Sequence, residues 1–462
     1  MMRYALILIA VFVGIVWYPV ESAWLDFCFN NFDLGIYAQA IQLLSIGDLN
    51  PWLSTRDLNL FNDHFDPILF LFSPFRIIAP AALVAIRVEM AGLCIAALAP
   101  IWLAYRKSVS WSVGIAACAM LLFSPLTLDA AFYPAHPGTW SLAPLSWMLA
   151  FLYLGWDLPA LAMFALALAC KEEYPLVGLL LSAALWKLQR ARSALGFFIV
   201  SVVWAVGVFV VRPYLIGPAA LYTDAVAQGA GLQLLITYDG ARQVLIRIGC
   251  LVLPFLFVTF NQQSLSKEFA AKRADFVPAL VPVVCLVALV SVRIAGGYWG
   301  NHRAAPLVAP AVFCFVYLLG KRSLSISRLV AFFVLTLALA FPALELGSRV
   351  WRGKAFKKHC PVDPERLTAL QESMDYIREN DDGPALVQGN LVPSMVDVLG
   401  VSQVGATKER GFSYLLIEKE SQRNTWPLSE EQFSALETWW RTNEEKRIVR
   451  DDKYVLLMET IN

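Results

Sequence analysis

The sequence predicts a mainly α-helical membrane protein, built as a polytopic transmembrane bundle of about eleven spans with a small C-terminal extracytoplasmic α/β domain. Three observations predict it. Of the 462 residues, 58% are hydrophobic and only 16% are charged, whereas soluble domains carry about 25% charged residues. Apolar runs that suit a bilayer core of about 30 Å recur along residues 1–345. From residue 346 onward the sequence becomes rich in charge.

The apolar runs give the expected spans in order. They are 4–20, 81–104, 109–127, 139–154, 158–170, 174–187, 194–215, 243–260, 275–292, 304–319 and 325–345. The first run follows Arg3, and we interpret it as an uncleaved span because no small-x-small cleavage site precedes "YPVESAWLDF". The runs 158–170 and 174–187 are short for ordinary spans, which favours broken helices with a charged tip near a cavity.

The basic residues set the expected orientation. They cluster on alternate connections, at Arg3, Arg106–Lys107, 187–192, 267–273 and 321–328. In the eleven-span scheme all of these connections lie on one side, and an excess of positive charge marks the cytoplasm. The N-terminus is therefore expected inside, and an odd number of spans places the C-terminal domain outside.

The C-terminal segment 346–462 has the helix and strand boundary signals of a soluble domain. A helix is expected to start at Asp363–Pro364, and strands are expected at 384–388 and 414–419. Ser429 with Gln432 predicts a capping box and a helix through Trp440. A hairpin is expected over 447–459. We therefore divide the chain into a transmembrane domain, 1–345, and an extracytoplasmic α/β domain, 346–462.

Cysteine usage adds one open question. The chain has eight cysteines. Six lie in apolar runs, where cysteine behaves as a small hydrophobic residue. Cys28 and Cys360 lie outside those runs, and a disulfide between them is an open alternative.

Polar residues collect at the expected outer ends of the spans. Of only four histidines, His64, His136 and His302 lie there. The same side receives further charged residues, namely Asp33, Asp63, Asp129, Lys171, Glu172, Glu173, Arg293 and Arg303. Acid, histidine and arginine on one face favour a polar site at the membrane boundary over scattered interfacial charge.

Each of these residues also has a simpler interpretation. Asp33 suits the N-cap of a helix lying along the surface, the segment 171–175 suits a solvated turn, and His302–Arg303 suits an interfacial anchor. The segment 60–74, in which polar residues precede "ILFLF", suits an ordinary interfacial segment. Arg87 and Glu89 lie inside a span, and we expect them to form an ion pair facing the bundle interior.

Six motifs resemble a known family. They are "FDLGIYAQ" (32–39), "HFDPILFLFSPF" (64–75), "FYPAHP" (132–137), "KEEYPLVGL" (171–179), "NHRAAPLVAP" (301–310) and "LVQGNLVPSMVD" (386–397). In this order they resemble a family of polytopic bacterial and archaeal membrane proteins catalogued as a domain of unknown function. That family is similar in layout to the GT-C glycosyltransferases, which use lipid-linked sugars.

The resemblance implies an inverting glycosyltransferase in the bacterial or archaeal cell (inner) membrane. It implies a catalytic acid in the first outer loop, which is Asp33 here, with Asp26 as the alternative. The paired acids common in that loop of GT-C enzymes are missing around Asp33, which leaves a divalent metal open; we assign no metal ligand. The donor is then a polyprenyl-phosphate sugar and the acceptor a glycan, lipid or protein.

The chemistry of such a transfer suggests roles for the remaining residues. A leaving phosphate needs cations, which Arg303, Arg293 and Lys171 can supply together with His302. His64, Asp63, Glu172, Glu173 and His136 are candidates for binding the substrates. No Gly-rich nucleotide loop and no basic nucleic-acid footprint is found in the sequence. A transporter or lipid flippase, and a non-catalytic envelope assembly protein, remain alternatives.

Overall fold

The computed structural model describes residues 2–28, 32–217, 305–320, 324–325, 327, 363–380, 383–398, 400–404, 411–419 and 428–461. The chain forms two compact units. The first, here called the helical unit, comprises Met1–Trp17, Phe61–Ile68 and Val88–Gly347. The second, here called the mixed unit, comprises Tyr18–Leu60, Leu69–Arg87 and Ser348–Asn462. The expected spans 243–260 and 275–292, and 328–345 of the last span, lie outside the described residues.

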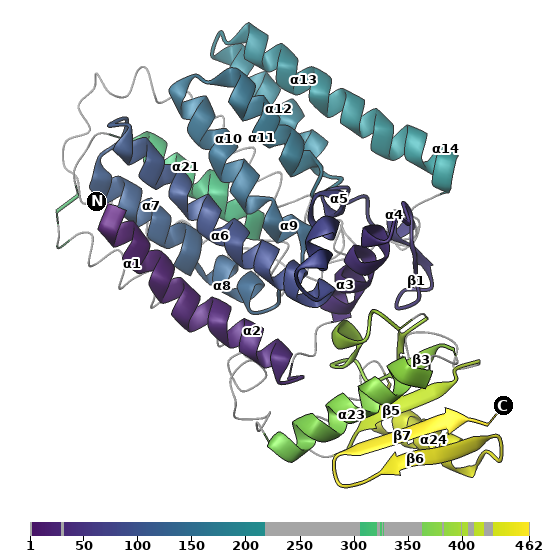
Figure 1. Cartoon of the computed structure of the whole chain (residues 1–462). Coiled ribbons are helices and arrows are strands. Elements are labelled where there is room, and N and C mark those ends of the chain that lie inside the picture. The colour runs from purple at the N-terminus through teal and green to yellow at the C-terminus, as the bar shows by residue number, and fades with distance from the viewer. Residues whose placement is uncertain are drawn as a thin grey trace. The chain divides into compact units, whose positions relative to one another are not determined.

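The described part of the helical unit consists of helices (Figure 1). In chain order they are α1 (Met2–Phe12), the π-helix η1 (Val13–Trp17), α4 (Leu60–Asp63), α6 (Ala81–Tyr105), α7 (Trp111–Phe123), α8 (Pro125–Ala131), α9 (Pro137–Trp140), α10 (Leu142–Leu154), α11 (Asp157–Leu168), α12 (Tyr174–Lys187), α13 (Ala191–Val206), the π-helix η3 (Gly207–Val211), α14 (Arg212–Ile216), the 3-10 helix η4 (Ala305–Leu307) and α21 (Val308–Leu319). Two of them, α4 and α6, start within the mixed unit.

Several helices suit a membrane by length and composition. Within the described residues, Arg3–Leu25, Ala81–Tyr105 and Ala191–Ile216 are long and apolar enough to cross one, and the bent pair α7–α8 makes a fourth if counted as one span. Shorter apolar helices cover Asp157–Leu168, Tyr174–Lys187 and Ala305–Tyr317. Helices thus occupy each expected span that falls in the described residues, while the total of about eleven crossings stays a prediction.

The expected span 109–127 is not one straight helix. Helix α7 ends at Phe123 and α8 starts at Pro125, with an angle of 43° between them. Proline has no amide hydrogen and disfavours a helical residue before it. Ser124 accordingly has an extended backbone, and its side chain caps the new helix by accepting from the Thr127 amide.

The mixed unit joins short helices from residues 18–87 to a C-terminal α/β domain. Its elements are α2 (Tyr18–Leu25), α3 (Phe32–Ser45), β1 (Trp52–Leu53), β2 (Leu58–Asn59), α5 (Leu69–Phe72), the 3-10 helix η2 (Ser73–Ile77), α23 (Pro364–Asn380), β3 (Ala385–Val387), the 3-10 helix η6 (Val392–Ser394), β4 (Ser402–Gln403), β5 (Tyr414–Glu418), α24 (Glu430–Thr442), β6 (Lys446–Asp451) and β7 (Val455–Thr460). Strands β1 and β2 form an antiparallel ribbon.

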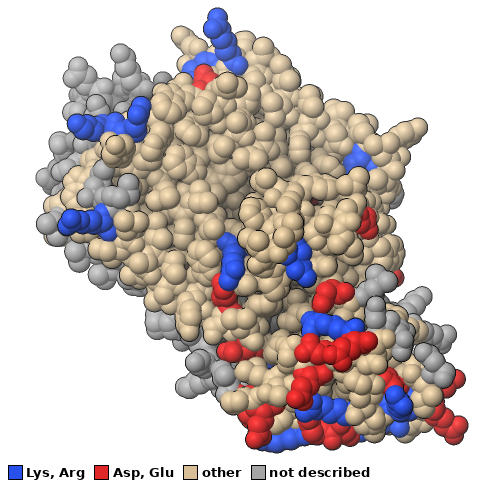
Figure 2. All heavy atoms as spheres, viewed as in Figure 1, with Lys and Arg blue, Asp and Glu red and all other residues tan. Residues whose placement is uncertain are grey.

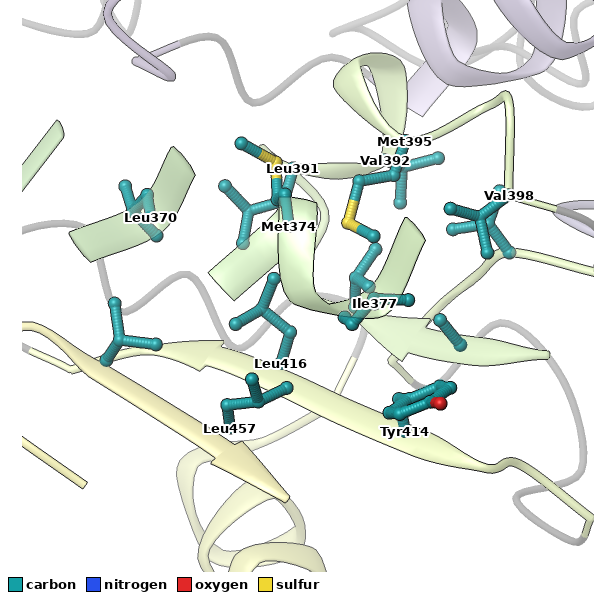
Figure 3. Packing of buried hydrophobic residues seen from close by; sticks show 14 of the residues in the cluster. Leu370, Met374, Ile377, Leu391, Val392, Met395, Val398, Tyr414, Leu416 and Leu457 are labelled. Carbon is teal, nitrogen blue, oxygen red and sulfur yellow. The ribbon is translucent and has the colours of Figure 1, made fainter. Parts of the chain in front are cut away.

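The C-terminal sheet has the strand order β4-β3-β5-β7-β6. Strand β3 is parallel to β4 and β5, and β7 is antiparallel to β5 and β6. Successive side chains of a strand point to opposite faces. Tyr414 and Leu416 of β5 therefore join one buried cluster with Met374 of α23 (Figure 3), whereas Leu415 and Ile417 join another with α24. The sheet is sandwiched between the two helices.

Most local predictions for the C-terminal segment are confirmed. Helix α23 begins at Pro364, the Ser429–Gln432 capping box is formed, and β6 and β7 form the expected hairpin. Figure 2 shows charged side chains crowding over this sheet and its helices, while few lie on the visible face of the apolar helices. The boundary expected at 345/346 lies outside the described residues and stays a prediction.

Close helix packing around Gly178 gives a test of the helical unit. A Cβ at Gly178 of α12 would lie 2.0 Å from Ser201 Oγ of α13 and 2.3 Å from Phe164 Cζ of α11. We expect Gly178→Ala to destabilise the protein by about 1–3 kcal/mol through overpacking. Gly92→Ala in α6, where nothing lies within 4 Å, is the matched control. Thermal unfolding in detergent measures both, and equal melting temperatures would contradict the close packing.

Candidate functional site

Four ionisable side chains meet inside the helical unit. His64 and Asp66 lie in the segment after α4, and Lys171 and Glu172 lie in the turn between α11 and α12. The two segments are joined by a 2.9 Å backbone hydrogen bond from the Ile68 amide to the Ala169 carbonyl. Asp66 and Glu172 are buried, with side chains 0% and 2% exposed, and Lys171 is 16% exposed. Such burial requires that the charges compensate one another.

The contacts within this cluster centre on Lys171. Its Nζ lies 3.8 Å from Asp66 Oδ1, 4.0 Å from Glu172 Oε2 and 3.3 Å from His64 Nδ1. His64 Nδ1 lies 2.9 Å from Glu172 Oε1. One ring nitrogen cannot both donate to Glu172 and accept from Lys171. We assign the Nδ1 proton to the shorter contact, so His64 donates to Glu172 and Lys171 faces the two carboxylates.

The surroundings shift the pKa values of Asp66 and Glu172 in opposite directions. Burial, only partly offset by Lys171, raises the pKa of Asp66 to about 7. Burial also opposes ionisation of Glu172, but Lys171 and His64 outweigh it and hold the pKa of this carboxyl well below its ordinary value. The pKa of His64 is raised, because Glu172 and Asp63 outweigh burial and the charge of Lys171. Glu172 is thus the permanent anion, and Asp66 changes charge near neutral pH.

Neighbouring elements fix the backbone around this cluster. Asn62 donates to the Ile216 carbonyl at 2.8 Å, and Arg212 donates to the Phe61 carbonyl at 3.3 Å. These two hydrogen bonds hold the start of the 61–68 segment against α14. On the other side, a Cβ at Gly138 would lie only 3.8 Å from the aliphatic chain of Lys171. The α9 segment is therefore in contact range of the lysine.

Glu89 holds that α9 segment from inside the span α6. Its Oε2 accepts from the backbone amides of Ala135 and His136, each at 2.9 Å, and from Trp140 Nε1 at 3.2 Å. Ala135 has a φ of +78°, which is uncommon for a residue with a Cβ. The carboxylate therefore fixes a strained turn whose continuation contacts Lys171.

The ion pair expected between Arg87 and Glu89 is not formed. Arg87 instead pairs with Glu21 of α2, with Nη2 and Oε1 2.6 Å apart. Residues two apart on a helix point to different faces, so the two side chains cannot meet. The prediction was wrong for this geometric reason, and both residues found partners on other elements.

The structure places the other sequence candidates as follows. Asp33 lies in the first turn of α3 and is half-buried. Asp63 ends α4 and is buried, Glu173 precedes α12, and His136 is the buried N-cap residue of α9, stacked on Tyr133. Arg293, His302 and Arg303 lie outside the described residues. The single outer cavity expected for Asp33, His64, Glu172 and His302 therefore stays a prediction, although His64 and Glu172 are in direct contact.

Asp66 is the site residue that the sequence reasoning missed. On sequence alone, an ordinary interfacial segment over 60–74 is enough to explain it. The available signal was its position directly before Pro67 and the run "ILFLF", because an acid that adjoins an apolar run must either reach water or be paired. Within the described residues, no group of three or more His, Cys, Asp or Glu side chains is arranged to hold a metal ion.

Comparison with known proteins gives limited likenesses. No known family model matches the chain, and no curated protein matches it. Among solved structures, the chain is similar to ArnT from Cupriavidus metallidurans bound to undecaprenyl phosphate, with 13% identity, 97% coverage of both chains and a TM-score of 0.49. The apo state of the same ArnT gives 14% identity, the same coverage and a TM-score of 0.38.

The raised pKa of Asp66 predicts a pH-dependent stability. A carboxyl whose pKa rises from 3.8 to about 7 on folding favours the folded state below pH 3.8, and this contribution is lost as the pH rises through about 7. Asp66→Asn mimics the protonated form. Its melting temperature, relative to the wild type, should therefore increase between pH 5 and pH 8.5. A difference that stays constant over this range would contradict the assignment.

The acceptor role of Glu89 predicts a contrast between two substitutions. Glu89→Leu leaves three donors without their acceptor, and each buried unsatisfied group costs about 1–3 kcal/mol. Glu89→Gln keeps an oxygen that accepts hydrogen bonds at the same place. Thermal unfolding in detergent should show a large loss for Glu89→Leu and a much smaller one for Glu89→Gln. Equal losses would show that the charge of Glu89, rather than its hydrogen bonding, is what the fold uses.

Proposed function

We propose that this chain is an integral membrane glycosyltransferase. It moves a sugar from a polyprenyl-phosphate-linked donor to a glycan, lipid or protein acceptor at the extracytoplasmic face, with inversion. The observation that carries the proposal is the buried cluster of Lys171, His64, Asp66 and Glu172 between short apolar helices. Ionisable groups buried among apolar helices are costly and usually functional.

The charge of the cluster suits a phosphate. Below pH 7 most Asp66 carboxyls are protonated, so Lys171 and His64 face Glu172 as the one permanent anion. Lys171 and a protonated His64 are then the two cations of the cluster, and a lipid-linked phosphate can pair with them. The lipid tail of such a donor is compatible with the apolar helices that border the cluster.

The transfer itself needs a base and a stabilised leaving group. In our proposal Asp33 accepts the proton of the acceptor hydroxyl as the oxygen bonds to the anomeric carbon. The bond from that carbon to the phosphate oxygen breaks, and the polyprenyl phosphate leaves with the electron pair. Lys171 and His64 then stabilise its negative charge, a role that the sequence analysis also gives to Arg293, His302 and Arg303.

One observation supports the extracytoplasmic side. Cys28, which closely follows the first span, is disulfide-bonded. Cys360, the partner that the sequence leaves open, lies outside the described residues. Stable disulfides are typical of oxidising compartments. The cysteine therefore favours an external location for the first outer loop, as the distribution of basic residues does.

The test is sugar transfer by the full-length protein in nanodiscs, with a labelled polyprenyl-phosphate sugar. Asp33→Asn keeps the shape of the side chain but removes its basicity, so we expect a rate loss of about a hundredfold to ten-thousandfold. If Asp33 only caps α3, asparagine serves almost as well. Asp48→Asn, at an exposed aspartate of the same unit, is the matched control.

The outcomes separate the alternatives. Normal turnover by Asp33→Asn would reject Asp33 as the base and direct attention to Asp63 or Glu172. Movement of the labelled lipid across the bilayer without a transfer product would favour the flippase. A wild-type protein that neither transfers nor moves the lipid would favour the assembly role.

A further inference from the structure

We propose that the C-terminal domain positions the first outer loop, and Asp33 with it, through a buried clamp of Arg366, Glu418 and Asn390. The three clamp residues are 2%, 1% and 4% exposed. Arg366 and Asn390 bind backbone atoms more than 300 residues earlier in the chain, and Glu418 holds these two side chains together. The structural part of this inference stands alone, whereas its consequence for catalysis rests on the proposed function.

The clamp is internally paired. Arg366 of α23 donates through Nε to Glu418 Oε1 of β5, and Asn390 donates through Nδ2 to Glu418 Oε2 at 2.9 Å. The backbone amide of Glu418 donates to Gln388 Oε1 at 2.8 Å. Both carboxylate oxygens of Glu418 therefore have partners, and its charge is matched by a guanidinium that is equally buried.

Two clamp residues also bind the backbone just after the first span. Arg366 Nη1 donates to the Asp26 carbonyl and Asn390 Nδ2 to the Phe27 carbonyl, each at 3.0 Å. These carbonyls follow directly on α2, where the helix end carries partial negative charge that a guanidinium stabilises. Phe27 has a φ of +52° and packs against the buried cluster of the sheet. A bulky residue holds this conformation only where its surroundings enforce it.

Two further contacts attach α3 to the same domain. A Cβ at Gly35, two residues after Asp33, would lie 2.9 Å from Val392 Cγ1 of η6, so α3 and η6 touch closely. Gln39, buried on α3, donates to Ser54 Oγ at 2.6 Å. The Ser54 carbonyl in turn accepts from Ser402 Oγ at 2.8 Å. The Ser54 hydroxyl donates to the Val401 carbonyl.

Together these contacts fix the backbone on both sides of Asp33. The chain is fixed before α3 by the clamp and along α3 by Gly35 and Gln39, so the first turn of α3 cannot shift independently of the domain. Catalytic groups tolerate very little displacement. Arg366, Glu418 and Asn390 are therefore positioning residues, which act on the reaction through the backbone.

The experiment removes the ion pair of the clamp, and with it the bond from Arg366 to the Asp26 carbonyl, without leaving a buried charge. Arg366→Met combined with Glu418→Leu replaces the ion pair by apolar groups, an exchange that buried pairs often tolerate. The control is Arg450→Met with Glu372→Leu, an exposed pair of the same domain with Nη1 and Oε2 2.8 Å apart. The measurement is the hydrogen-exchange rate of the backbone amides in the full-length protein in nanodiscs, taken separately for 26–28, α3 and β5.

We expect exchange in 26–28 and α3 to become roughly tenfold faster or more in the clamp variant. Exchange in β5 should stay unchanged, and the control pair should change neither region. Unchanged exchange in 26–28 and α3 would overturn the clamp. A loss of protection confined to β5 would also overturn it, because the three residues would then serve only the folding of the domain.

A second variant covers the case in which the whole domain unfolds. Gly35→Ala places a methyl group against Val392 and should speed exchange in α3 without touching the clamp. Adding Val392→Ala makes room and should restore slow exchange. Failure of Gly35→Ala to act, or of Val392→Ala to rescue, would contradict the attachment of α3 to η6.

Activity then separates this inference from the proposed function. If Asp33 is the base, the clamp variant and Gly35→Ala should lower kcat with little change in KM for the donor. Faster exchange without a change in kcat supports the clamp and rejects the dependence of catalysis on it. Inactive wild-type protein with the expected exchange pattern rejects the proposed function and leaves the clamp standing.

Discussion

The charge of Lys171 has to be matched in an apolar surrounding, and the candidate site is organised by that constraint. An unpaired ammonium in such a place would lose its proton or open the helices to water. The fold instead surrounds it with Asp66, Glu172 and His64, which come from two distant parts of the sequence. The pairing therefore fixes the short helices α11 and α12 against the 61–68 segment and also creates the chemistry of the site.

The same constraint separates the roles of two similar acids. Glu172 receives a hydrogen bond from His64 and stays ionised, whereas Asp66 has the weaker compensation and titrates near neutral pH. Groups with displaced pKa values are typical of sites that bind charge or move protons. Burial, offset unequally by Lys171 and His64, thus gives the site both a fixed anion and a carboxyl that gains and loses its proton.

Local patterns were predictable from the sequence, and partners distant along the chain were not. The capping box at Ser429 and the β6–β7 hairpin depend on residues a few positions apart, so a short window contains their cause. The choice of Glu21 rather than Glu89 by Arg87 depends on how helices face one another. Asp66 was overlooked because its burial is decided by Lys171, more than a hundred residues later. Composition predicted a polar side of the bundle, which stays a prediction, and only the packing shows which groups meet.

The bond from Arg366 to the Asp26 carbonyl spans 340 residues, which has a consequence for how the protein is made. The first span leaves the ribosome early, while the groups that bind the carbonyls at its C-terminal end belong to the last quarter of the chain. At about 5–20 residues per second, roughly 20 to 70 seconds of synthesis separate the two. During that time the carbonyls after α2 and the left-handed Phe27 lack the partners that hold them in the finished fold. The loop that follows the first span is therefore among the last parts of the protein to mature, and a chain cut short before β5 leaves that loop incomplete even when every span before it has inserted.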